Sequence, residues 1–195
     1  FRDAPVGVAL IDSISGRLIE VNQKYAAIVG RTINEMKSTD WMSITHPDDV
    51  QEDLDNMALL NAGKISIFEM NKRYIRPDNS EVWVHLTVSP VSVKDKTKPR
   101  HLAMVEDITE RVKYEEQFRF IAENVDDLII ILDAQFTPTY ASPALNRIFG
   151  YSEEDFKNKS IFDTMYNQDR DELKEDIKQL LETKARNNKS QYRIR

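Results

Sequence analysis

Hydrophobic and polar residues alternate with a period of two along residues 65–76 and 81–93, which is the pattern of half-buried β-strands. The apolar positions of the second stretch are Val82, Val84, Leu86 and Val88. The turn-forming residues 77–80 lie between the two stretches and predict a hairpin. Shorter strands are expected at 8–12, 17–21 and 101–107. Two strands, a helical middle and three further strands are typical of an α+β domain with an antiparallel sheet.

The helical middle contains one long and one short helix. Apolar spacings of three and four residues predict a long helix that begins at His46-Pro47 and ends at Gly63. Its apolar stripe is expected to comprise Val50, Leu54, Met57 and Ala58. Asn22 is expected to cap the short helix, which ends at Gly30.

The chain contains a repeat with an offset close to 120 residues. VALID at 8–12 matches IIILD at 129–133, and KRYI at 72–75 matches YRIR at 192–195. A second long helix is expected between these segments, with an apolar stripe of Leu173, Ile177, Leu180 and Leu181. We therefore expect two copies of one fold.

The first copy resembles a PAS domain with its C-terminal PAC portion. The resemblance rests on the motifs ALID (9–12), EVN (20–22), W-x-x-ITHPDD (41–49), KRYIRPDNSEVWV (72–84) and VEDITER (105–111). It implies a five-stranded antiparallel sheet in the order 2-1-5-4-3, flanked by helices. The second copy resembles another PAS domain, and the repeat leaves it without its last two strands. The expected organisation is a PAS/PAC domain at 1–109, a connecting signalling helix at 110–124 and an incomplete PAS domain at 125–195.

Composition excludes several classes of chemistry. The 195 residues include no cysteine, which excludes disulfides, a thiolate nucleophile and cysteine-ligated metal sites. The five glycines are too far apart for a phosphate-binding loop or a dinucleotide fingerprint. The net charge of −6, with no basic face in either half, argues against nucleic acid as a partner. No apolar run approaches the roughly 18 residues of a membrane span. We expect no membrane contact by this chain and a cytoplasmic location, and any membrane anchor would lie elsewhere in the parent protein.

No cofactor is evident from the sequence. The axial histidine of haem-binding PAS relatives lies within the long helix, whereas His46 opens it, so we interpret His46 as a cap. The flavin-photoadduct branch of the family needs a cysteine. His85 and His101 lie on expected strands without a second ligand at metal spacing. Carboxylate pairs lie at helix starts or on solvated faces, so we assign no catalytic or metal-binding residue and do not expect this chain to be an enzyme.

Eight side chains are candidates for lining a cavity between the sheet and the helices: Trp41, Met42, Phe68, Met70, Tyr74, Val84, Leu86 and Met104. The simplest interpretation is that they form an ordinary core. The functional interpretation is that they hold a small apolar or planar ligand, in a cavity that methionines make adaptable.

The junction between the last strand and the connecting helix contains the candidate signal-relay residues Asp107, Ile108 and Thr109. The helix then carries an apolar seam with spacings of 4, 3 and 4, formed by Tyr114, Phe118, Ile121 and Val125. The seam is too short to hold a dimer alone. It predicts either an amphipathic linker packed on its own domain or a signalling helix within a homodimer.

The resemblance implies a sensory module of a bacterial-type signalling protein. Its output domain, such as a histidine kinase or a diguanylate cyclase, would lie outside this sequence. A small ligand or a partner would then change the packing of the connecting helix. The alternative is a dimerisation or protein-interaction module with a filled core. A stand-alone enzyme is the third hypothesis, and turnover by this chain would support it.

Overall fold

The computed structural model describes residues 4–91, 99–156, 160–183 and 192. Contacts divide the chain into two compact units, Phe1–Glu115 and Glu116–Arg195. We describe each unit by itself.

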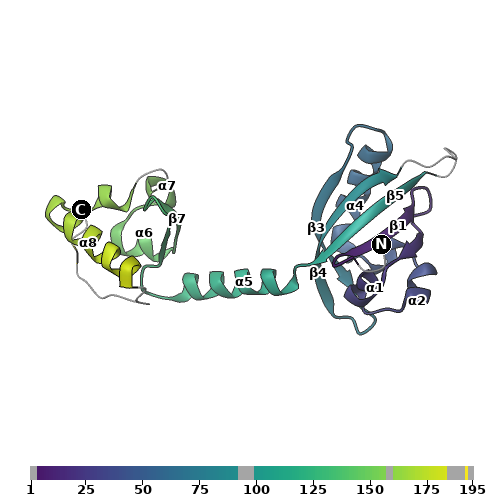
Figure 1. Ribbon diagram of the computed structural model, residues 1–195, viewed down its shortest axis with the longest axis horizontal. Helices are drawn as coiled ribbons and strands as arrows, with labels where there is room; N and C mark the ends of the chain where they lie inside the picture. The colour runs from purple at the N-terminus through teal and green to yellow at the C-terminus, as the bar shows by residue number, and fades with distance from the viewer. Residues whose placement is uncertain (1–3, 92–98, 157–159, 184–191, 193–195) are drawn as a thin grey trace. The chain divides into compact units, whose positions relative to one another are not determined.

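The first unit is built on a five-stranded antiparallel sheet (Figure 1). Its strands are β1 (Gly7–Asp12), β2 (Leu18–Val21), β3 (Phe68–Ile75), β4 (Glu81–Val91) and β5 (Arg100–Asp107). Their order across the sheet is β2-β1-β5-β4-β3, which confirms the order expected from the resemblance. β1 therefore pairs with β5, although most of the unit separates them in sequence.

Five helices complete the unit or leave it: α1 (Gln23–Val29), α2 (Ile33–Lys37), α3 (Trp41–Ile44), α4 (Pro47–Asn61) and α5 (Thr109–Asn124). The cap expected at Asn22 is confirmed, since its side-chain oxygen accepts a hydrogen bond of 2.9 Å from the Tyr25 N–H. The same oxygen accepts from the Val8 N–H at 2.9 Å, so Asn22 also ties the start of α1 to β1. The expected hairpin joins β3 to β4, with Asn79 in the left-handed region at φ 63°.

The core lies between the sheet and α1 to α4 (Figure 1). It includes Val82, Val84, Leu86 and Val88 of β4, which are at most 3% exposed. The buried face of α4 differs from the predicted stripe, because Asp53, Met57 and Leu60 are buried whereas Leu54 is 38% exposed. A polar residue therefore occupies an inward position of this helix.

The expected inward position of Met104 is wrong. Directly opposed residues of an antiparallel pair lie on the same face of the sheet. Val105 is opposite Leu86 and Ala103 is opposite Val88, so these two residues of β5 face the core. Met104 lies between them on the outer face and is 39% exposed.

The described strands of the second unit form a two-stranded antiparallel sheet of β6 (Ile130–Leu132) and β7 (Pro138–Ala141). Helical segments follow at α6 (Ala144–Phe149), α7 (Glu153–Phe156), η1 (Ile161–Thr164) and α8 (Asn167–Thr183). In the stripe expected along α8, Leu173 and Ile177 are partly buried, and the side chains of Leu180 and Leu181 lie outside the described part. The strand expected at 192–195 also lies outside the described residues, except for Tyr192.

Local geometry repeats between the two units. The Ser142 hydroxyl accepts from the Ile129 N–H at 3.1 Å, as Asn22 accepts from the corresponding strand in the first unit. Gly150 ends α6 at φ 74°, as Gly30 ends α1 at φ 71°. The second unit thus repeats the strand, strand, helix sequence of the first, although α6 lacks a side-chain cap like that of Asn22 on α1.

Candidate functional site

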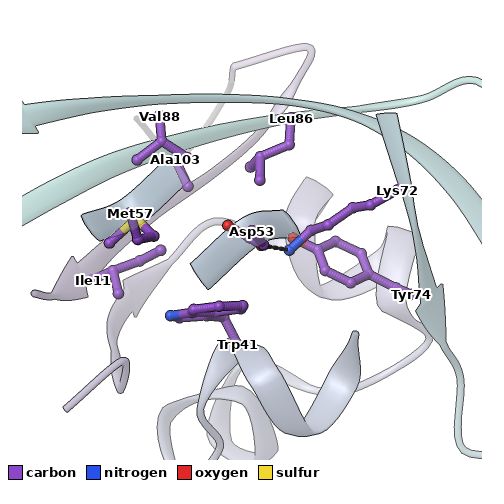
Figure 2. Close-up of a pocket in the computed structure, with 9 residues that line it drawn as sticks. All are labelled: Ile11, Trp41, Asp53, Met57, Lys72, Tyr74, Leu86, Val88 and Ala103. Carbon is purple, nitrogen blue, oxygen red and sulfur yellow. Dashed lines mark hydrogen bonds and ion pairs between the residues drawn. The ribbon is translucent and has the colours of Figure 1, made fainter. Parts of the chain in front are cut away.

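A small pocket opens inside the first unit, between α3, α4 and the inner face of the sheet (Figure 2). Its lining residues are Ile11, Trp41, Asp53, Met57, Lys72, Tyr74, Leu86, Val88 and Ala103. The cavity has a volume of about 10 Å³, which is close to the volume that one water molecule needs. A larger molecule can enter only if side chains move.

Three of the eight predicted lining residues border this pocket: Trp41, Tyr74 and Leu86. Four others, Met42, Phe68, Met70 and Val84, belong to the core or pack against it without bordering the pocket. Met104 lies on the outer face of the sheet. The pocket interpretation of these residues remains a prediction.

The pocket contains a buried ion pair that the sequence reasoning missed. The Lys72 ammonium on β3 contacts the Asp53 carboxylate on α4, and the two residues are 1% and 2% exposed. The signal was present in the pattern, because Lys72 alternates with Met70 and Tyr74 on the inward face of β3. Asp53 is likewise four residues before Met57 on the buried face of α4. A charged residue at an inward position indicates that it has a partner in the core, without identifying that partner.

Aromatic rings and a hydroxyl surround the ammonium. Lys72 Nζ lies 5.0 Å from the ring centre of Trp41 and 4.7 Å from that of Tyr74, and both rings attract the cation. It also donates to Thr45 Oγ1 at 3.1 Å. Burial lowers the pKa of Lys72, and Asp53 opposes this shift without cancelling it.

Two phenols lie beside the ion pair. The hydroxyl oxygens of Tyr25 and Tyr74 are 2.9 Å apart and hydrogen-bonded, and both residues are buried. Burial raises the pKa of both groups well above the ordinary value of 10.0. Both phenols therefore stay neutral at physiological pH.

A second ion pair, between Arg73 and Asp49, joins α4 to β3 at the edge of the sheet. We call this pair and the Lys72–Asp53 pair the two clamps. Arg73 donates two side-chain hydrogen bonds to Asp49, from Nε at 3.0 Å and from Nη2 at 2.8 Å. Its backbone N–H donates to the same carboxylate at 2.8 Å. Partial burial raises the pKa of Asp49, but these hydrogen bonds outweigh it and the pKa is lowered. Lys72 and Arg73 are thus adjacent on β3, and they bind Asp53 and Asp49, which lie one helical turn apart on α4.

The start of α5 is fastened to β4 at Trp83. The Trp83 N–H donates to Thr109 Oγ1 at 3.1 Å, and the Ile108 N–H donates to the Trp83 carbonyl at 2.9 Å. Asp107 accepts from the Thr109 N–H at 2.9 Å, and Ile108 is 4% exposed. Arg73 lies over the Trp83 ring at 5.4 Å. The three candidate relay residues therefore lie where β5 ends and α5 begins, and two of them, Ile108 and Thr109, bond to Trp83.

The structure places the predicted seam residues largely in solvent. Tyr114, Phe118 and Ile121 of α5 are 65%, 41% and 56% exposed, and Val125 follows the helix and is partly buried. The rings of Phe118 and Tyr140 pack edge to face at 5.4 Å within the second unit. The predicted helix over 110–124 forms as α5.

The expected cap at His46 is confirmed, because its Nδ1 accepts from the Asp48 N–H at 3.3 Å at the start of α4. His85 Nδ1 lies 2.8 Å from Asn71 Oδ1, and His101 Nδ1 lies 2.7 Å from Ser13 Oγ. Within the described ranges, no three metal-binding side chains come together.

Family models match both units. The model described as the PAS domain matches residues 5–110, which are more than half of the chain, and the model described as the PAS fold matches residues 116–195. The chain belongs to the PAS domain family. The pocket with its ion pair therefore lies inside a PAS fold, between the sheet and the helices that cover it.

Among curated proteins, this PAS chain is similar to the probable diguanylate cyclase DgcE of Escherichia coli (strain K12), at 29% identity. The match covers 64% of this chain and only 12% of that protein. Among solved structures, the PAS domain of a protein from Colwellia psychrerythraea has 15% identity and a TM-score of 0.51, over 57% of this chain and 92% of that chain. An RNA-binding light-oxygen-voltage receptor has 19% identity and a TM-score of 0.51, over 62% of this chain and 34% of that chain. At these identities the two structures show the fold alone.

In the part of the PAS chain that the structure describes, no helix is both long and apolar enough to cross a membrane.

Proposed function

We propose that this PAS chain is the sensory part of a signal-transduction protein and that a small molecule in the pocket changes the state of α5. The observation that carries the proposal is the pair of clamps between α4 and β3. One clamp, Lys72 with Asp53, borders the pocket. The other, Arg73 with Asp49, lies one residue further along β3 and beside Trp83, which holds the start of α5.

The proposed relay follows from this arrangement. A ligand that enters the pocket beside the Lys72–Asp53 pair moves α4 relative to β3. The second clamp shares both elements, so Arg73 shifts on the Trp83 ring. The hydrogen bonds of the Trp83 backbone to Ile108 and Thr109 then favour one of two packings of the junction between β5 and α5. A ligand acts on the output only through its different affinity for those two states.

The second unit is proposed to be another PAS domain, which makes the chain a tandem with boundaries at 1–109, 110–124 and 125–195. The family match to 116–195 and the repeated geometry at Ser142 and Gly150 support this organisation. The PAC portion is assigned to the end of the first domain on the VEDITER motif.

The output is proposed to be a diguanylate cyclase or a histidine kinase domain elsewhere in the parent protein. The similarity to a diguanylate cyclase supports the first, and the family resemblance supports either. The PAS fold is a sensory and non-catalytic fold, so we assign no reaction to this chain. We expect this chain to lie in the cytoplasm, with any membrane anchor elsewhere in the parent protein.

Native mass spectrometry of the purified chain tests ligand binding. Comparison with the denatured mass is expected to reveal extra mass that is lost on denaturation. A chain that carries no extra mass would favour an interaction module instead.

The relay is tested in the full-length parent. Replacing Asp107 and Thr109 together with alanine is expected to uncouple output from the sensor while the first unit stays folded. Thr87→Ala, on the outer face of β4, is the matched control. Unchanged output in the double variant would contradict the relay.

The second candidate function is a homodimerisation module, favoured by the exposure of Tyr114, Phe118 and Ile121 on α5. A dimer through these side chains would bury them. Analytical ultracentrifugation is expected to show a dimer that Ile121→Asp weakens and that Gln117→Asp, an equal change in charge on the same helix, leaves intact. A monomeric wild-type chain would contradict this candidate.

A further inference from the structure

The two oxygens of the Asp53 carboxylate have different surroundings. Oδ2 contacts the Lys72 ammonium. Among the described residues, Oδ1 has no hydrogen-bond partner, although Asp53 is 2% exposed. Figure 2 shows one oxygen turned away from Lys72, toward the side of the pocket where Met57 lies. A carboxylate oxygen without a partner that faces a pocket is an acceptor for a donor that enters the pocket.

The cation of the pair is already engaged. The Lys72 ammonium has three N–H donors. Asp53 and Thr45 accept two hydrogen bonds from it, and the faces of Trp41 and Tyr74 flank it. An anionic ligand would therefore compete with the two aromatic faces for the one N–H of Lys72 that makes no hydrogen bond, and it would be repelled by Asp53. A cationic ligand would be repelled by Lys72 across the same small space.

The rest of the pocket is apolar. Ile11, Met57, Leu86 and Val88 supply aliphatic walls. The side chain of Met57 is unbranched and flexible, so it can move aside for a ligand larger than the present opening. These walls suit the hydrocarbon body of a ligand, with a single polar group directed to Asp53.

We propose that this pocket takes a small uncharged molecule that has one hydrogen-bond donor on an apolar body and that donates to Asp53 Oδ1. This inference rests on the proposed function, because it names the chemical class of ligand for the same pocket. A neutral donor satisfies the open acceptor and leaves the Lys72–Asp53 pair in place, so it adds no uncompensated charge to the core.

Four probes of similar size separate the alternatives: butan-1-ol, its isomer diethyl ether, butyrate and butylammonium. The measurement is an NMR titration of the full chain labelled at the methionine methyl groups. Met57 reports on the pocket, and Met104 on the outer face is the internal control. Butan-1-ol is expected to shift the Met57 signal, with an affinity at least about tenfold higher than that of the ether, because a hydrogen bond to a charged acceptor is lost with the ether. The two ions are expected to bind more weakly still.

A double variant tests the role of the acceptor. Asp53→Leu with Lys72→Met removes both charges, and its preference for butan-1-ol over diethyl ether is expected to disappear. If the variant does not fold, the ranking of the four probes on the wild-type chain still tests the proposed class of ligand.

Other rankings overturn the inference in distinguishable ways. Equal affinity for the ether, or tighter binding of either ion, would reject the ligand class while leaving ligand binding intact. No Met57 shift with any probe would also reject the ligand class, and extra mass in the native spectrum would then still support a sensory pocket for another ligand.

Discussion

Replacing Asp53 with leucine leaves the Lys72 ammonium buried without its carboxylate. Lys72 is 1% exposed, so bulk solvent cannot take the place of the lost partner. Removing one member of a buried pair costs about 3–5 kcal/mol. The remaining hydrogen bond to Thr45 and the two aromatic faces limit the cost, since each is worth about 1 kcal/mol. We expect the free energy of unfolding to fall by about 3 kcal/mol.

The double variant Asp53→Leu/Lys72→Met should regain most of that stability. Replacing both charges by apolar groups of similar volume removes the desolvation cost together with the attraction, and such changes are often neutral. If each single variant loses about 3 kcal/mol and the double variant stays within about 1 kcal/mol of wild type, the coupling energy is about 5 kcal/mol.

The assay is urea unfolding followed by tryptophan fluorescence. The chain has two tryptophans, Trp41 and Trp83, and both lie in the first unit, so the signal reports on the domain that contains the pair. Additive losses in the double variant, or a loss below about 1 kcal/mol in Asp53→Leu, would refute the view that this pair is a coupled, desolvated unit.

The pH dependence gives an independent check. The folded pKa of Lys72 lies below its ordinary value of 10.5. The unfolded chain then binds more protons between the folded pKa and 10.5, so stability from this group rises with pH in that window. Asp53→Leu removes the group that opposes the shift and lowers the pKa further. The destabilisation of Asp53→Leu should therefore shrink between pH 7 and 10.

Three further predictions concern neighbouring contacts. Asp49→Asn should destabilise the domain by about 1–2 kcal/mol, since a half-buried charged pair with Arg73 is lost. The variant should also lose less stability than wild type as pH falls below 3.8, because the pKa of Asp49 is lowered in the fold. Thr109→Val should speed hydrogen exchange of the Trp83 amide, whose N–H donates to Thr109, by about tenfold. The amides of α1 serve as the reference. Tyr74→Phe should cost about 1–3 kcal/mol, because the buried hydroxyl of Tyr25 loses its partner. Wild type should lose stability above pH 10, where unfolded phenols ionise and the folded ones do not, and Tyr74→Phe should show a shallower loss.

Each of these has an outcome that contradicts it. If Asp49→Asn loses as much stability at low pH as wild type does, the salt bridge with Arg73 has no energetic role. Unchanged exchange of the Trp83 amide in Thr109→Val would show that the junction between β5 and α5 is not part of the relay. An alkaline slope that is the same in Tyr74→Phe and wild type would mean that other groups control stability above pH 10.

Local signals along the chain determine much of the fold. The period of two identifies β3 and β4 and their hairpin, because successive side chains of a strand point to opposite faces. The caps at Asn22 and His46 follow from side-chain oxygen and nitrogen acceptors that lie next to free N–H groups. The order of the strands came from motifs that resemble the PAS family rather than from the pattern itself.

Where both faces of an element carry apolar residues, the sequence was ambiguous. β5 reads Leu102, Ala103, Met104 and Val105 in succession, so nothing local tells which pair faces inward. The register against β4 decided for Ala103 and Val105. On α4, the apolar stripe chosen from spacing included the exposed Leu54 and omitted Asp53, because a carboxylate is counted as polar until its partner is known.

The amino-acid sequence by itself determined which segments form strands and helices, which family the chain resembles and which cysteine-dependent chemistries are excluded. The tertiary structure alone decided that Lys72 meets Asp53 in the core, that Arg73 lies on Trp83 and that Trp83 holds the start of α5. These contacts join residues from different elements. A charge on one element becomes tolerable in the core only when folding brings an opposite charge from another element next to it, and no local pattern contains that distance.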